Sequence, residues 1–121
     1  DVLVLGSSTW GAGELQDDWY DGVNVLKKCD LSHKYVALFG CGDSDSYSDT
    51  FCDAIGIIYE DLKDTHCKFC GAVDTAGYTF DSSIAVVDGK FVGLPIDEVN
   101  EDNQTEERIS AWAEQVKQEI S

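Results

Sequence analysis

The sequence has no methionine, a single proline and few basic residues. Eight lysine and arginine residues stand against 24 aspartate and glutamate residues, for a formal charge of −16. Because proteins hold nucleic acid through cationic side chains, this balance argues against a nucleic-acid partner. No apolar run is long enough to cross a membrane and no secretory signal is present, so we expect a cytoplasmic protein without a membrane partner.

The missing methionine also bears on the extent of the chain. A complete translation product begins with methionine, whereas residue 1 already leads into an apolar run. We therefore expect an upstream part to be absent from this sequence. At 121 residues the chain predicts one domain, smaller than a complete doubly wound nucleotide-binding fold usually is.

The five cysteines predict reduced thiols. Their number is odd and no secretory signal accompanies them, which favours a cytoplasm-like compartment. Cys67 and Cys70 form a CxxC pair, but a structural zinc site needs a second pair. We expect small buried residues there and no metal site.

A polar loop follows the first apolar run, Val2 to Gly6. That run predicts a buried parallel strand, and open α/β sheets bind ligands at the carboxyl ends of such strands. Ser8 and Thr9 can hydrogen-bond a polyol or phosphate, and Trp10 can stack on a flat ring. On this stretch alone, an ordinary strand-to-helix connection with Trp10 folded over the core explains the residues equally well.

A second loop of the same kind follows the apolar run 34–39. It contains Gly40 to Asp43 and then Tyr47. If the two strands are parallel neighbours, Trp10 and Tyr47 approach a planar ring from its two faces while the loop backbone bonds the polar edge of that ring. The two loops together favour a flat cofactor with a polar tail.

Apolar spacing predicts three helices. Their inward stripes are Leu15, Trp19, Val23 and Leu26, weakened at Gly22; Phe51, Ile55, Ile58 and Leu62, capped by Ser48 or Asp49; and Ile109, Trp112, Val116 and Ile120, capped by Thr105. A third strand is expected at 67–73. The Asp88-Gly89 turn predicts a hairpin within a small antiparallel excursion over 74–97.

Three stretches in order, STWGAGELQ, GCGDSDSY followed by FCDA, and GKFVGLPID, resemble flavodoxins. The resemblance implies an α/β flavodoxin-like doubly wound parallel sheet in three α/β/α layers, here lacking its first strands. Residues 1–121 would form a single domain, the carboxyl-terminal portion with strands three to five. In long-chain flavodoxins an insertion splits the last strand, and we assign 74–97 to it.

The same resemblance implies non-covalently bound FMN and a low-potential one-electron carrier, not an enzyme. It places Ser8 and Thr9 near the ribityl chain, and it places Trp10 and Tyr47 against the two faces of the ring. The backbone of Cys41, Gly42 and Asp43 would contact the pyrimidine edge, and the Gly11–Ala12 peptide would turn over when the flavin gains an electron. Thr50 and Cys52 stand where relatives often carry amides that contact the ring. The implied partners are a reductase and an acceptor protein.

Acidic side chains near both loops favour basic redox partner proteins, since a negative rim steers a basic protein into place. Asp43, Asp45 and Asp49 belong to this rim. The hydroxyl-rich phosphate loop of flavodoxins, T-x-T-G-x-T, does not occur in the sequence. We therefore expect an upstream segment to supply it and to complete the sheet. The chain alone would then expose a strand edge and aggregate, and the complete protein would be a monomer.

Two other functions use the same topology. A flavodoxin-like NAD(P)H:quinone reductase needs room over the flavin for its substrate, whereas Trp10 and Tyr47 are expected to cover both faces. A flavin-free binding module of receiver type needs carboxylates at the strand ends to hold a divalent cation, and glycine, serine and threonine stand there instead.

Overall fold

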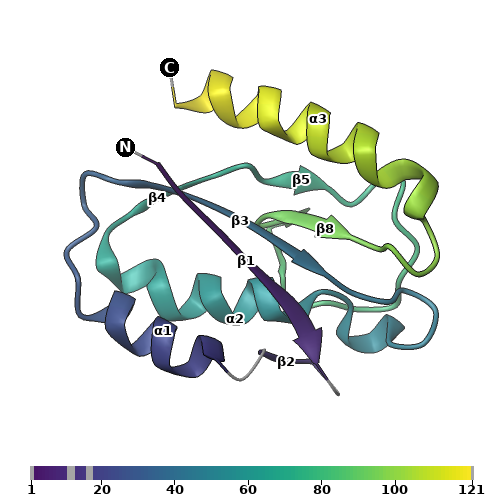
Figure 1. Ribbon diagram of the computed structural model, residues 1–121, viewed down its shortest axis with the longest axis horizontal. Helices are drawn as coiled ribbons and strands as arrows, with labels where there is room; N and C mark the ends of the chain where they lie inside the picture. The colour runs from purple at the N-terminus through teal and green to yellow at the C-terminus, as the bar shows by residue number, and fades with distance from the viewer. Residues whose placement is uncertain (1, 11–12, 16–17, 121) are drawn as a thin grey trace.

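The computed structural model describes residues 2–10, 13–15 and 18–120, and it forms three layers (Figure 1). The middle layer is a sheet in the order β2-β1-β3-β4, with β8 also paired to β3. Helices α1 and α2 cover one face and α3 covers the other. The elements of these layers are β1 (Val2–Trp10), β2 (Glu14–Leu15), α1 (Asp18–Lys27), β3 (Tyr35–Cys41), α2 (Asp53–Leu62), β4 (Lys68–Cys70), β8 (Leu94–Ile96) and α3 (Asp102–Glu119).

Strands β1 and β3 are parallel neighbours, as the two apolar runs predict. Their register runs from Val2 opposite Tyr35 to Ser8 opposite Cys41. The prediction of a fully buried first strand was wrong on one face, where Val4 is 52% exposed. The reason is that α3 packs over β3, β4 and β8 and leaves this side of β1 uncovered.

The core between the sheet and helices α1 and α2 contains the predicted stripe of α2. Phe51, Ile55, Ile58 and Leu62 are all buried, which confirms that spacing. Helix α1 continues to Lys27, past Gly22, where the sequence predicts a weakened helix. Helix α2 begins only at Asp53, because Ser48–Thr50 form a separate short 3-10 turn, η1, and Cys52 has a φ of 54°.

Helix α3 begins at Asp102, three residues before the predicted cap Thr105. Trp112 and Val116 face the sheet as expected, but Ile109 is 44% exposed. Its place on the inner face is taken by Arg108, whose guanidinium lies 4.0 Å from the centre of the Tyr78 ring. The predicted stripe was therefore wrong by one residue at its start.

The strand that pairs with β3 on the side away from β1 is divided into two pieces, β4 and β8. The predicted strand 67–73 breaks at Gly71, which has a φ of 81°. The excursion that follows contains β5 (Val73–Asp74), β6 (Val86–Val87) and β7 (Lys90–Phe91), paired antiparallel in the order β5-β7-β6. Asp88 and Gly89 form the turn of the β6–β7 hairpin, with positive φ angles of 55° and 82°.

Strand β8 returns the chain to the main sheet. Leu94 pairs in parallel with Phe39, so the excursion is shorter than the predicted 74–97. Gly93 permits this close approach, since a Cβ there would collide with the carbonyl oxygen of Leu38. In the described part of the chain, no helix has the length and apolar character needed to cross a membrane.

Candidate functional site

A hollow of about 290 Å³ opens at the carboxyl ends of β1 and β3. Ser8 and Cys41, one on each strand, lie opposite each other in the parallel register and so bring the two loops together. The hollow is lined by Ser8, Thr9, Cys41, Gly42, Asp43, Tyr47, Thr50 and Val99. All of these except Val99 were expected from the sequence. Ligands of open α/β sheets bind at this edge.

Thr9 connects the hollow to helix α2. Its Oγ1 accepts a hydrogen bond of 3.1 Å from the backbone N–H of Ala54, in the first turn of α2. Cys52, at the N-cap position, makes no side-chain cap hydrogen bond. A side chain of β1 therefore supplies the cap that the helix itself lacks.

The loop after β3 is closed by its own hydrogen bonds. Oδ1 of Asp43 accepts from the N–H groups of Asp45 and Ser46 at 3.1 and 3.0 Å. The N–H of Tyr47 donates to the carbonyl oxygen of Asp43 at 2.9 Å. The hydrogen bond from the Ser46 backbone and one from Asn100 lower the pKa of Asp43. Its carboxylate is therefore charged at neutral pH, at the edge of the hollow.

Tyr47 follows this turn, and its ring is accessible from the hollow. Its side chain lines the hollow, and 51% of the residue is exposed. A ring held at the edge of a hollow can stack on a flat ligand. A stacking role for Tyr47 stays a prediction.

Sequence reasoning missed the residues behind this loop. Asp97, directly after β8, is completely buried and accepts hydrogen bonds from Ser44 and Asn100. Burial by itself would raise the pKa of Asp97, but these hydrogen bonds outweigh it and the pKa is lowered. The available signal was a polar D-x-x-N sequence immediately after a buried strand.

Cys52 does not reach the hollow. It is fully buried, and its Sγ donates to the carbonyl oxygen of Gly40 at 3.7 Å. Burial raises the pKa of this thiol. A ring contact by the Cys52 side chain is therefore excluded in this arrangement, because the residue completes the core beneath the loop.

Part of the backbone of this loop is already hydrogen-bonded within the protein. The N–H of Gly42 donates to the carbonyl oxygen of Ile96 at 2.9 Å, so it is not available to a ligand edge. Burial and the nearby Glu98 raise the pKa of Cys41. Of the three backbone segments expected at the pyrimidine edge, those of Cys41 and Asp43 remain candidates.

Three predicted residues cannot be placed. Gly11 and Ala12 lie outside the described residues, and so does the side chain of Trp10, whose backbone ends β1. Stacking by Trp10 and reorientation of the Gly11–Ala12 peptide stay predictions. Among the described residues, no three histidine, cysteine, aspartate or glutamate side chains gather closely enough to hold a metal ion.

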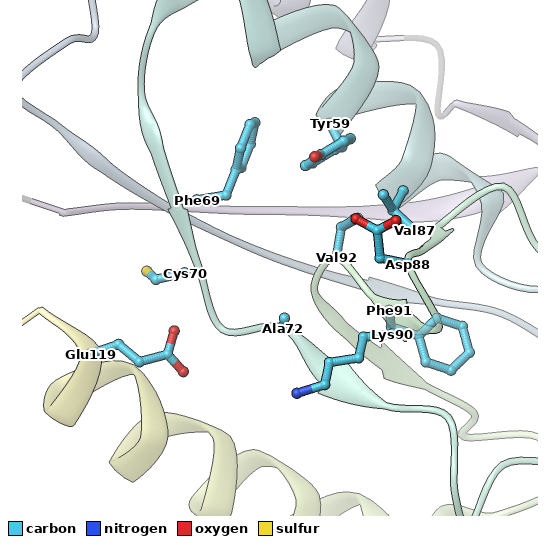
Figure 2. Close-up of a pocket in the computed structure, with 10 residues that line it drawn as sticks. All are labelled: Tyr59, Phe69, Cys70, Ala72, Val87, Asp88, Lys90, Phe91, Val92 and Glu119. Atoms are coloured by element: carbon cyan, nitrogen blue, oxygen red, sulfur yellow. The ribbon is translucent and has the colours of Figure 1, made fainter.

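A second hollow, of about 240 Å³, lies between α2, β4 and the β6–β7 hairpin (Figure 2). The rings of Tyr59 and Phe69 form its apolar side, with centroids 4.5 Å apart. Glu119 lies at its edge and accepts a 3.0 Å hydrogen bond from the N–H of Gly71. This hollow contains none of the predicted residues. The hollow at the strand ends, where hydroxyl, backbone and carboxylate groups converge, is the stronger candidate.

The fold and the site together define a doubly wound α/β domain with a ligand hollow at the carboxyl ends of its parallel strands. The family model described as Flavodoxin matches residues 1–112. The chain belongs to the flavodoxin family, and the fold predicted for it is confirmed.

Its relatives agree in sequence and in structure. Flavodoxin 1 of Azotobacter vinelandii is 45% identical over 122 residues, with 99% of this chain and 70% of the relative aligned. The flavodoxin of Helicobacter pylori is 50% identical over 115 residues, covering 95% and 69%. The crystal structure of Fusobacterium nucleatum flavodoxin bound to flavin mononucleotide superposes with a TM-score of 0.93 at 31% identity, covering 98% of this chain and 71% of that one.

Proposed function

We propose that this protein carries electrons one at a time on a non-covalently bound FMN, held in the hollow at the ends of β1 and β3. The observation that carries the proposal is the gathering of Ser8, Thr9 and Tyr47 around one hollow from two separate loops. Membership of the flavodoxin family supports the cofactor and the function. Flavodoxins are electron-transfer proteins, not enzymes.

The residues present fit this cofactor. Tyr47 offers an exposed ring for stacking, and Ser8 offers an exposed hydroxyl for the polar chain of FMN. Thr9 accepts from Ala54 but can still donate its own hydroxyl proton outward. When bound, FMN supplies the electron chemistry, and these side chains bind and orient it.

Asp43 sets the electrostatics of the hollow. Its carboxylate is held by the turn that follows it and lines the hollow. A flavin ring that becomes negatively charged in the hollow would therefore lie close to this negative charge. Like charges repel, so reduction to an anion is disfavoured beside this carboxylate. This is the basis of the proposed low potential.

The surface around the hollow supports basic protein partners. Asp45, Asp49 and Glu98 are exposed near its mouth, together with the apolar side chain of Val99. An acidic rim around a small apolar contact steers a basic redox protein to the edge of the cofactor. Flavodoxins pass electrons to such redox partner proteins. A basic character of the partners, a monomeric state, and the lack of a nucleic-acid or membrane partner belong to this proposal.

Residues 1–121 are proposed to be one domain of the long-chain type. The support is the excursion between β4 and β8, two strands that both pair with β3. The free edge of β1 is proposed to pair with a further strand. Within the described residues, Val2 to Ser8 pair on one side only. Free thiols at all five cysteines support a reducing, cytoplasmic location.

A titration with FMN tests the cofactor site. With an upstream strand and a hydroxyl-rich phosphate loop restored to the chain, we expect stoichiometric binding with quenching of the flavin fluorescence and a shift of its visible absorption. Tyr47→Ala should weaken binding by about tenfold or more, as loss of one aromatic stack on a planar ring predicts. Tyr20→Ala is the matched control, because Tyr20 on α1 is similarly exposed at 47% and lies outside the hollow. Unquenched flavin at saturating protein would exclude the site.

A further inference from the structure

The loop after β3 is held from outside by the residues that follow β8. The carboxylate of Asp97 accepts from the Ser44 N–H at 3.1 Å and also from the Ser44 hydroxyl. Its other hydrogen bonds come from Asn100, at 3.0 Å from the backbone N–H and 3.1 Å from the side-chain amide. One carboxylate thus joins the loop to the chain beyond the last strand.

Asn100 extends this connection to the hollow itself. Its side-chain amide also donates to Oδ1 of Asp43 at 2.8 Å. Oδ1 of Asp43 is the same atom that accepts from the N–H groups of Asp45 and Ser46. A single amide group therefore bridges the buried carboxylate of Asp97 and the carboxylate that shapes the turn.

Every backbone N–H from Ser44 to Tyr47 is used in this network. Ser44 donates to Asp97, Asp45 and Ser46 donate to Asp43, and Tyr47 donates to the Asp43 carbonyl. The turn that ends at the Tyr47 ring is thus fixed without any ligand. Preorganised groups bind more tightly because they lose less conformational freedom on binding.

Burying the charged carboxylate of Asp97 costs free energy unless the hydrogen bonds that it accepts offset that cost. A charged group removed from water is disfavoured unless hydrogen bonds replace its hydration. Asp97 is 0% exposed, and within the described residues the donors to its carboxylate come from Ser44 and Asn100. Closing the sheet at β8 does not require a carboxylate there, whereas holding Ser44 does.

We propose that Asp97 and Asn100 are positioning residues that set the shape of the loop 42–47, so that Asp43 and Tyr47 stand ready for the flavin ring. The inference rests on the proposed function, since it names what this loop is shaped for. Neither residue lines the hollow, and both act through Ser44 and Asp43.

Asp97→Asn is the decisive variant. It keeps the size of the side chain but replaces one acceptor oxygen with an NH₂ group, so the donors of Ser44 and Asn100 lose part of their acceptor. Asp64→Asn is the matched control, because it makes the same chemical change at an exposed aspartate of the short turn Lys63–Thr65, outside the hollow. Two quantities are measured in each variant: amide hydrogen exchange at 44–47 without flavin, and the Kd for FMN.

In Asp97→Asn we expect exchange at 44–47 to accelerate by about tenfold or more and the Kd for FMN to rise by a similar factor, from the loss of charge-assisted hydrogen bonds. In Asp64→Asn both should stay within about twofold of the unsubstituted protein, because an exposed charge contributes little. An Asp97→Asn protein that melts earlier but keeps the exchange and the Kd overturns the proposal, since its role would then be stability alone.

If Asp97→Asn does not fold, Ser44→Ala and Ser44→Thr decide the matter. The first removes the hydroxyl donor to Asp97 and should accelerate exchange and weaken binding, while the second restores the hydroxyl and should restore both. Equal behaviour of the two variants overturns the proposal. Failure of the unsubstituted protein to bind FMN would reject the proposed function, whereas the exchange measured without flavin would still decide whether Asp97 shapes the loop.

Discussion

Replacing Thr9 with valine tests whether the first loop and helix α2 depend on each other. The Thr9 hydroxyl accepts from Ala54 at 3.1 Å, and the residue at the N-cap of α2, Cys52, makes no side-chain cap hydrogen bond. Valine has nearly the same shape but no acceptor. The N–H of Ala54, a fully buried residue, would then lose its partner.

The expected loss follows from the cap and from its burial. Loss of an N-cap side chain costs about 1 kcal/mol, and an unsatisfied buried donor costs about 1–3 kcal/mol. We expect a decrease of about 1–2 kcal/mol in the free energy of unfolding. With an unfolding entropy of about 2.1 cal/mol/K per residue over 121 residues, the Tm should fall by about 4–8 °C.

Thermal unfolding of the flavin-free protein, followed by circular dichroism, measures this decrease. Thr9→Ser is the control, because it keeps the hydroxyl and should unfold close to the unsubstituted protein. A Tm for Thr9→Val within about 1 °C of the unsubstituted protein would refute the reasoning, since that shift corresponds to less than about 0.3 kcal/mol. So would a Thr9→Ser protein as unstable as Thr9→Val, because keeping the hydroxyl acceptor would then not preserve the stability.

Other variants test the packing and the buried carboxyl groups. Gly71→Ala should lower the free energy of unfolding by more than about 1 kcal/mol in urea titrations, because Gly71 has a φ of 81° and its new Cβ would lie 2.5 Å from Nε1 of Trp112; an unchanged midpoint would contradict this. Burial raises the pKa of Asp53, so the folded chain keeps that proton to higher pH and stability falls as pH rises above about 4. Asp53→Asn should flatten that part of the stability curve, and an unaltered slope would count against it. The pKa of Asp97 is lowered, so the stability that its charged carboxylate contributes is complete above about pH 4 and is lost as pH falls through the folded pKa. Acid unfolding of Asp97→Asn should therefore show a shallower pH dependence in this range.

The parts of the site that local chemistry determines could be predicted from the sequence. Two apolar runs with polar loops at their ends predicted β1 and β3 as neighbours, and the register of Ser8 with Cys41 follows from that pairing. The hydroxyl groups, the glycine and the tyrosine then meet at one edge because the carboxyl ends of parallel strands meet there. The α2 stripe was predictable for a similar reason, since its spacing of four, three and four matches a helix.

The predictions that were wrong concern residues whose burial and contacts depend on segments distant in the sequence. Val4 looks like a core residue in the sequence, but its burial depends on whether α3 extends over β1, and it does not. Ile109 fits the helical stripe, yet Arg108 takes the inner face because the Tyr78 ring lies beneath it. Cys52 was assigned to the ligand because it stands where flavodoxins often carry an amide, whereas its φ of 54° turns the chain there and its thiol points to Gly40.

Asp97 shows why the second loop could not be understood from its own residues. It lies 53 positions after Ser44, and only the pairing of β8 with β3 brings the two together. The excursion between β4 and β8 is joined to the site at its end, where the Ile96 carbonyl accepts from Gly42 and the Asp97 carboxylate accepts from Ser44. It is also joined within its length, where the N–H groups of Asp81 and Ser82 donate to the carbonyl oxygen of Ser48. A change in the excursion should therefore leave the hollow unaltered only where it keeps both the register of Leu94 to Ile96 on β3 and the hydrogen bonds of Asp81 and Ser82 to Ser48. A shift of that register by a single residue would turn Asp97 to the opposite face and release the loop, because alternate residues of a strand face opposite sides.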